Sequence, residues 1–344
     1  MRRPPLTLCP MLTSSAHPAR TGDAAAGGAA FAAVLRPLLV GAVDYAGLFP
    51  PAGLAMTPAV RRYAAYRRGA SRALLGRFVV PVARLEEFEA AALDLLPTDV
   101  SGEAEQTPSE QTPSGSAPWR LSALAGHDVG ADLARAAAFN ARHAPDTGAG
   151  RAVIDAVEWK ADAPAALAGA AAARARHLGA ASLFAELPAG TEATPYAVAA
   201  RDTGLGLKLR MGGVTPDAFP PPDLVLGFLA AVAEYGVPAK ATAGLHHALP
   251  GDHPLTYEPG CARGAMYGFV NVLLAGALLA AGRAPAAVAP LLTERDPAVV
   301  AALGLSLGAG GRRALAGFGS CSFEEPAAEL AALGWWPHDG AATP

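Results

Sequence analysis

Cysteine is scarce in this chain of 344 residues, and the three that occur, Cys9, Cys261 and Cys321, lie far apart. Their number is odd, and none belongs to a C-x-x-C pair. This spacing argues against a disulfide scaffold, because secreted domains of that kind carry closely spaced, evenly numbered cysteines. We therefore expect a reducing, cytoplasmic environment.

Charge is also scarce. Charged residues make up 17% of the chain and the net charge is −3, whereas 52% of the residues are hydrophobic. Without a basic surface a nucleic-acid partner is not expected. The apolar content is enough for a substantial core in one large domain. The sequence thus favours a globular protein with a small-molecule substrate.

A long hydrophobic run is missing as well. The most apolar stretch, GFVNVLLAGALLAAG (268–282), contains Asn271 and is shorter than the roughly 20 residues needed to cross a bilayer. The apolar run near the start is short and broken by proline, which is not typical of a signal peptide. We expect no association with a membrane.

Two segments lack the periodicity of regular structure. Residues 1–38 are rich in Ala, Gly, Pro and Arg, and residues 98–118 contain a near-repeat, QTPSE and QTPSG, with almost no large apolar side chain. We predict a flexible extension over 1–38, a flexible loop insertion over 98–118, and a single domain over 39–337.

Within that domain, strand-like runs alternate with alanine-rich helical segments. This alternation predicts an α/β fold built from right-handed βαβ units. Eight strands favour closure into a (β/α)8 TIM-type barrel, with an open doubly wound sheet as the alternative. The predicted strands are 41–48, 76–85, 119–126, 151–160, 181–188, 205–213, 239–247 and 313–323.

The connection between the seventh and eighth strands, 248–312, is far longer than one helix. Its composition predicts a helical insertion of two or three helices. An insertion at this point lies beside the catalytic face of a barrel, where it would act as a lid or as a contact in a homodimer.

Polar residues recur on the later strands. In a parallel barrel alternate residues of each strand point inward, and sites gather at the carboxyl ends of the strands. This parity groups Lys208 with Arg210 on the sixth strand, and it groups further candidates on the seventh. The fourth and fifth strands add acidic residues. The further candidates are Lys240, Thr242, Gly244 and His246 on the seventh strand, Asp155 on the fourth and Glu186 on the fifth. Additional cavity residues are Asp44 and Tyr45 on the first strand and Glu158 and Lys160 on the fourth.

Two lysines in one apolar cavity would each disfavour the ammonium form of the other, by desolvation and by repulsion. A neutral amine attacks carbonyl carbons and forms a Schiff base, whose iminium accepts electrons when the adjacent C–C bond breaks. A carboxylate and the second lysine would then move protons. This chemistry needs neither a metal nor an organic cofactor.

Four segments carry a resemblance to a known family, namely VIDAVEW (153–159), LKLRMGG (207–213), AKATAGLHH (239–247) and FGSCSFEEPAAELAALG (318–334). In this order they resemble the class I deoxyribose-phosphate aldolases, which are TIM barrels. The resemblance implies Lys208 as the Schiff-base lysine, Lys240 and Asp155 as the proton-handling pair, and phosphate binding at Gly319 and Ser320.

The chain departs from this family at several positions. Leu245 replaces the second glycine of the family's K-x-x-G-G, and His246 and His247 follow it. Arg210, Met211 and Gly212 stand where the family has T-S-T-G after its reactive lysine. Arg210 with the histidines would suit a carboxylate or another polar head group as well as a phosphate. The backbone amides at Gly212, Gly213 and Gly244 would approach such an anion, or these glycines only permit turns.

Other readings of the same residues remain open. Lys208 could be a structural lysine paired with Glu186 or Asp155, and Ser320 could cap a helix. His246 and His247 could bind zinc together with carboxylates, which would make the barrel a metal-dependent hydrolase, lyase or isomerase. Adjacent strand residues point to opposite faces and no H-x-H spacing occurs, so we predict no metal site. A non-catalytic barrel that binds a sugar or an anion is the third alternative.

Overall fold

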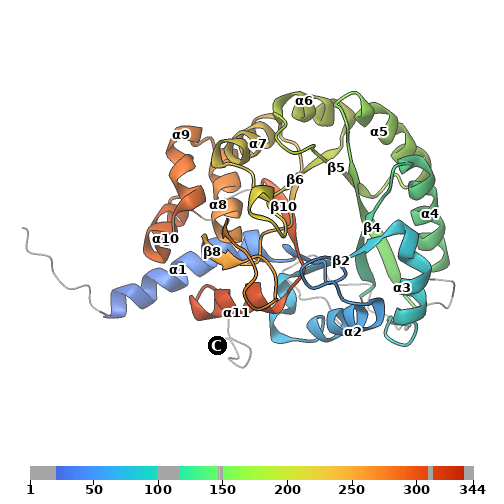
Figure 1. Cartoon of the computed structure of the whole chain (residues 1–344), viewed down its shortest axis with the longest axis horizontal. Coiled ribbons are helices and arrows are strands. Elements are labelled where there is room, and N and C mark those ends of the chain that lie inside the picture. The colour runs from blue at the N-terminus through green and yellow to red at the C-terminus, as the bar shows by residue number, and fades with distance from the viewer. Residues whose placement is uncertain (1–20, 99–116, 146, 148–149, 309–312, 337–344) are drawn as a thin grey trace, which may run out of the picture.

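The protein folds into a closed barrel of eight parallel strands surrounded by helices (Figure 1). The computed structural model describes residues 21–98, 117–145, 147, 150–308 and 313–336. The strands follow one another around the ring in the order β1-β10-β7-β6-β5-β4-β3-β2. The predicted (β/α)8 TIM-type barrel is confirmed, and the open doubly wound sheet is wrong.

Each of the eight predicted strand segments overlaps one barrel strand. Short apolar runs bounded by turns form strands that are buried on both sides, as parallel sheets require. Lys208 and Lys240 lie directly opposite each other in the register of β6 and β7. The barrel strands are β1 (Val43–Tyr45), β2 (Leu75–Pro81), β3 (Trp119–Leu124), β4 (Ala152–Lys160), β5 (Ser182–Glu186), β6 (Gly206–Arg210), β7 (Ala239–Thr242) and β10 (Leu315–Ser320).

A helix follows every barrel strand. α4 begins at a cap in which the Asp128 carboxylate accepts a hydrogen bond from the Ala131 amide at 3.0 Å. α6 and α7 both end at a glycine in the left-handed conformation, Gly204 and Gly236. These helices are α2 (Met56–Tyr66), α3 (Leu85–Ala92), α4 (Val129–Arg142), α5 (Ala166–His177), α6 (Thr194–Thr203), α7 (Pro222–Tyr235), α8 (Phe269–Ala280) and α11 (Glu324–Ala332), with 3-10 turns η1 (Ala70–Leu74), η2 (Val82–Arg84) and η3 (Pro216–Ala218).

The long connection after β7 is only partly the predicted helical insertion. It begins with an antiparallel hairpin of β8 (Gly251–Pro254) and β9 (Arg263–Met266), which the sequence analysis did not predict. The almost wholly buried α8 then packs against α7 and serves as the barrel's own helix. The inserted helical part consists of α9 (Pro285–Val288), η4 (Ala289–Thr293) and α10 (Pro297–Leu305).

The prediction of a flexible extension over residues 1–38 is wrong for its second half. Residues Thr21–Leu39 form α1, which packs against α10 (Figure 1). Phe31 and Leu35 on this helix are fully buried. The Phe31 ring meets Trp335 edge-on at a centroid distance of 4.9 Å, and a Cβ at Gly304 would lie 2.2 Å from that ring. α1 is therefore part of the packed domain.

Replacing Phe31 with alanine is expected to lower the free energy of unfolding by about 3–5 kcal/mol, because it leaves a cavity between α1, α10 and Trp335. Urea unfolding of the variant and the wild type measures this difference. The exposed Val40 supplies the control variant, Val40→Ala. A loss for Phe31→Ala no larger than that of the control would mean that α1 is not held in the fold.

Two sequence predictions lie partly or largely outside the described residues. They are residues 1–20 of the predicted extension 1–38 and residues 99–116 of the predicted loop insertion 98–118. Within the described part of the chain, none of the helices combines the length and the apolar character needed to cross a membrane.

Candidate active site

Five charged side chains from five strands meet inside the barrel. Each comes from a strand that places it in the lumen, and each is at least nine-tenths buried. Charges this deep persist only when they are paired. They are Asp44 on β1, Glu158 on β4, Glu186 on β5, Lys208 on β6 and Lys240 on β7, and we call them the lumen cluster.

Lys208 lies between two carboxylates. Its Nζ is 2.6 Å from Oε2 of Glu158 and 2.7 Å from Oε2 of Glu186. The other oxygen of Glu186 accepts a hydrogen bond from Nε of Arg210 at 3.1 Å. The suggested pairing of Lys208 with Glu186 is therefore present. Burial raises the pKa of Glu186, but Lys208 and Arg210 outweigh burial and lower it overall.

Lys240 lies deeper than Lys208. Its Nζ is 2.5 Å from Oδ2 of Asp44, donates to Oε1 of Glu158, and is 3.3 Å from the Ser122 hydroxyl. Burial lowers the pKa of this lysine, but Asp44 and Glu158 outweigh burial and raise it. The expectation that the two lysines share an apolar cavity and favour each other's neutral form is thus wrong for Lys240.

Glu158 connects the two lysines, since one carboxylate oxygen contacts each ammonium group. The Ser122 hydroxyl donates a further hydrogen bond to Oε1 at 2.6 Å. Burial raises the pKa of this carboxyl, but Lys208 and Lys240 outweigh burial and hold the pKa far below its usual value of 4.5. Glu158 is therefore a carboxylate at neutral pH.

A cavity of about 370 Å³ opens above the lumen cluster, and we call it the mouth cavity. Lys208 lines this cavity, whereas Lys240 lies beneath it. Lys208 is thus the lysine of the cluster that a ligand in the mouth cavity can reach. Other lining residues include Glu158, Lys160, Glu186, Arg210, Gly213, Thr242, His246, Gly319 and Cys321, so the structure brings most of the predicted site residues together here.

Asp155, predicted as the acidic partner of the lysines, does not contact them. Its carboxylate binds Nε of Arg77 and Nη2 of Arg120, each at 2.6 Å, and its side chain is 27% exposed. The predicted positive neighbour exists, but it is a pair of arginines. The register of β4 against β3 shifts beside Asp155, and Glu158, three residues further on, is the β4 carboxylate that reaches Lys208 and Lys240.

The predicted glycines lie in crowded turns. Gly244 has a φ of +68°, and a Cβ there would come within 2.9 Å of the Gly212 Cα. A Cβ at Gly212 would lie 2.4 Å from the Phe219 ring. Their conformational freedom and close backbone approach are therefore needed for packing at the ends of β6 and β7.

His246 lies at the edge of the mouth cavity among three polar partners. Its Nδ1 is 3.3 Å from Oε2 of Glu325, 3.4 Å from the Ser320 hydroxyl and 3.8 Å from Sγ of Cys321. Burial lowers the pKa of His246, but Cys321 and Glu325 outweigh burial and raise it to about 9. Ser320 is thus engaged by a histidine and does not line the mouth cavity.

The folded protein is expected to keep His246 protonated up to about pH 9. A pKa raised above the usual 6.5 means that protonated His246 stabilises the fold fully below pH 6.5. This contribution, on the order of 1–3 kcal/mol, is lost as the pH rises to about 9. NMR titration of the imidazole measures the pKa directly, and Glu325→Gln should lower it. A wild-type titration near pH 6.5 would contradict the assignment.

His247 points away from His246. It binds Oε1 of Glu329 at 2.6 Å and stacks on His253 of the hairpin with ring centroids 3.4 Å apart. The two adjacent histidines therefore bind different carboxylates. No group of three or more His, Cys, Asp or Glu side chains that could hold a metal ion occurs in the described ranges.

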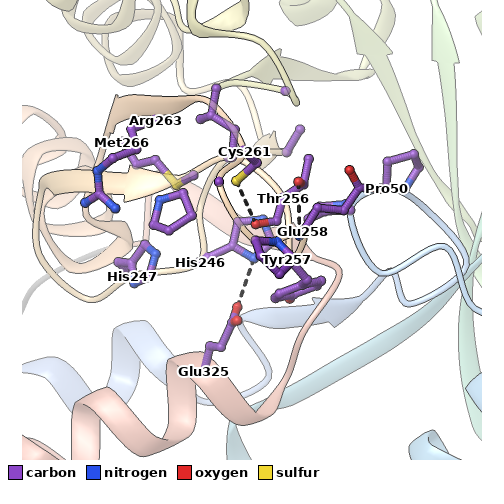
Figure 2. A pocket seen from close by; sticks show the side chains of 18 residues that line it. Pro50, His246, His247, Thr256, Tyr257, Glu258, Cys261, Arg263, Met266 and Glu325 are labelled. Atoms are coloured by element: carbon purple, nitrogen blue, oxygen red, sulfur yellow. Dashed lines mark hydrogen bonds and ion pairs between the residues drawn. The ribbon is translucent and has the colours of Figure 1, made fainter.

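A second cavity, of about 460 Å³, lies beneath the β8–β9 hairpin, and we call it the hairpin cavity (Figure 2). Pro50, Gly213, Ala243 and His246 line both cavities, so the two are adjacent. Figure 2 shows Glu325 of α11 reaching His246 from one side while hairpin residues Thr256 to Cys261 lie across the cavity.

Several residues of this region were not predicted. Ser122 is a small polar residue within an apolar strand, and this pattern was the only indication in the sequence that it belongs to the site. Glu325 and Tyr257 belong to other segments, and only the fold brings them to His246 and Cys321. No protein-family model matches the chain, and no curated protein matches it either.

Proposed function

We propose that the chain is an aldolase-type carbon–carbon lyase that forms an imine between Lys208 and the carbonyl carbon of a small aldehyde or ketone. The observation that supports this proposal is the position of Lys208. It is a buried amine that reaches the mouth cavity, with a carboxylate on either side of its Nζ at 2.6 and 2.7 Å. The TIM-barrel fold is consistent with an enzyme of this type.

The two carboxylates supply the proton transfers that imine formation needs. Lys208 gives a proton to Glu186 or Glu158, and the neutral amine attacks the carbonyl carbon. Loss of water from the carbinolamine yields the iminium.

The bond between the α and β carbons of the iminium then breaks: its electron pair forms the enamine and neutralises the nitrogen, while the β-hydroxyl group gives its proton to a carboxylate and becomes the carbonyl of the released product. The nitrogen of Lys208 is then neutral, so the two carboxylates have one cation fewer beside them and their pKa values rise. This rise favours transfer of the β-hydroxyl proton of the substrate to a carboxylate. Protonation of the enamine at its α carbon and hydrolysis of the resulting iminium free Lys208.

Lys240 acts in this proposal as a fixed charge. Its raised pKa keeps it an ammonium group, and its contact with Glu158 orients that carboxylate toward Lys208. Glu158 thereby takes the proton-handling part that the resemblance assigned to Asp155. Lys240 keeps its proton and is a positioning residue, which departs from the proton-handling role that the resemblance implied.

A second candidate function is a barrel that binds a sugar or an anion without turnover. It is supported by the charge pairing within the lumen cluster, because each lysine nitrogen already contacts two carboxylates. In this case replacing Lys208 would change ligand affinity while no reaction existed to be lost.

Reductive trapping separates the two candidates. The protein is incubated with acetone and sodium borohydride, digested, and mapped by mass spectrometry. The chain holds three lysines, Lys160, Lys208 and Lys240, and Lys160 is the exposed one. We expect an isopropyl adduct on Lys208. An adduct confined to Lys160, or no adduct beside demonstrated turnover, would reject the imine mechanism.

A further inference from the structure

The hairpin cavity offers a mainly apolar surface next to the reactive lysine. Its carbon-rich lining comes from Pro50 and Pro51 after β1, from Leu255 and Pro259 of the hairpin segment, and from Met266 of β9. At about 460 Å³ it is in the size range of small-molecule pockets. The residues that it shares with the mouth cavity place it beside the space that Lys208 lines.

The basic side chains of the hairpin cavity are already paired with carboxylates. His246 faces Glu325 at 3.3 Å, and Arg263 binds Asp252 at 2.8 Å. His247 binds Glu329 at 2.6 Å. An anionic group would therefore have to displace a carboxylate before it could bind a cation here. The cavity is suited to a neutral, apolar part of a ligand.

The end of β10 is equally unsuited to a phosphate. α11 begins just after Ser320, and its first turn carries Glu324 and Glu325. Two carboxylates at a helix N-terminus already occupy the favourable end of the helix dipole and repel another anion. These groups weaken the case for phosphate binding at Gly319 and Ser320.

We propose that the substrate is an unphosphorylated aldehyde or ketone with an apolar aryl or branched alkyl substituent. Its carbonyl carbon lies in the mouth cavity at Lys208, and its substituent lies in the hairpin cavity. The position of the carbonyl rests on the proposed imine function. Occupation of the hairpin cavity by the apolar substituent does not, and it can be measured without any reaction.

The first experiment measures binding alone, with 4-phenylbutan-2-ol, which cannot form an imine. Ligand-observed NMR and calorimetry are applied to the wild type and to four variants. Lys208→Met should still bind the alcohol, and should weaken binding less than the cavity variants below do, because the aryl group keeps its place in the hairpin cavity. Met266→Trp and Cys261→Trp fill the hairpin cavity and should weaken binding by roughly tenfold or more, because an aryl group buries a large apolar area. Val299→Trp, on the exposed face of α10, is the matched control and should bind normally.

The second experiment compares borohydride trapping of acetone and of 4-phenylbutan-2-one, two methyl ketones that differ by a benzyl group. The half-saturating concentration should be roughly tenfold lower for the aryl ketone. Cys261→Trp should remove this preference, whereas the control Val299→Trp should keep it. Two cavity variants are used so that a folding defect in one, detected by circular dichroism, does not decide the result.

The outcomes separate the two proposals. Equal trapping of both ketones, or no binding of the alcohol to the wild type, overturns the extended site and leaves the imine at Lys208 intact. Binding of the alcohol that is lost in both cavity variants, with neither ketone trapped, supports the apolar subsite and rejects the imine.

Discussion

Replacing Lys208 with methionine is expected to abolish the borohydride adduct and to lower kcat/KM for carbonyl substrates at least about a thousandfold. Methionine has a similar length but no amine, so neither the carbinolamine nor the iminium can form. The fold should survive the change, since Glu158 keeps its contact with Lys240 and Glu186 keeps its contact with Arg210. Steady-state kinetics and mass spectrometry of the trapped protein measure both effects.

Lys160→Met is the matched control for this prediction. Lys160 also lines the mouth cavity, but it is exposed at the end of β4 and is not in the lumen cluster. We expect its loss to leave kcat nearly unchanged, because Lys160 takes no part in bond breaking. Turnover that persists in Lys208→Met but disappears in Lys160→Met would show that Lys160, and not Lys208, is the reactive lysine.

Replacing Glu158 with glutamine is expected to lower the free energy of unfolding by about 3–5 kcal/mol. The amide keeps the shape of the side chain, but it removes the negative charge that both ammonium groups contact. Asp44 and Glu186 then remain as one carboxylate for each lysine. Urea unfolding at neutral pH measures the loss.

The pH dependence of this effect has a defined sign. The folded pKa of Glu158 is lowered, so its carboxylate contributes fully above the ordinary value of 4.5, and the contribution is lost as the pH falls toward the folded pKa. The difference between the wild type and Glu158→Gln should therefore shrink in acid. Glu192→Gln, on the exposed segment before α6, is the control. A difference that grows below pH 4 would contradict the assigned charge state.

The barrel could be predicted because its signal is local and repeated. Each β-like run is short and apolar, each helical segment has a typical length, and their alternation occurs across the whole domain. The strand bounds were nevertheless too wide: the seventh was predicted over 239–247, whereas β7 ends at Thr242. Strand parity therefore does not apply to Gly244 and His246, which lie in the loop beyond.

The charged residues of the site were only partly predictable. Lys208 and Lys240 share strand positions that the register of β6 and β7 confirms as neighbours. The choice between Asp155 and Glu158 depended on the register of β4 against β3, which shifts at the bulge and is not visible in the sequence. The nearness of Glu158 to the carboxyl end of its strand was the available signal.

The missed elements depend on tertiary contacts. α1 has a sequence rich in Ala and Gly, and what fixes it is the contact of Phe31 with Trp335 at the other end of the described chain. The β8–β9 hairpin has little alternation of apolar and polar residues. One contact between this hairpin and the loop after β7 is the stacking of His253 on His247. Neither contact can be inferred from local pattern.

The distribution of the lumen cluster along the chain has a consequence for assembly. The strands up to β5 contribute the three carboxylates, Asp44, Glu158 and Glu186, and the strands from β6 onward contribute the two lysines. A partial barrel formed from either group of strands alone would hold these charges without their counterions. The charges are compensated only when β6, β7 and β10 close the ring with the first five strands, which disfavours stable intermediates that lack either group.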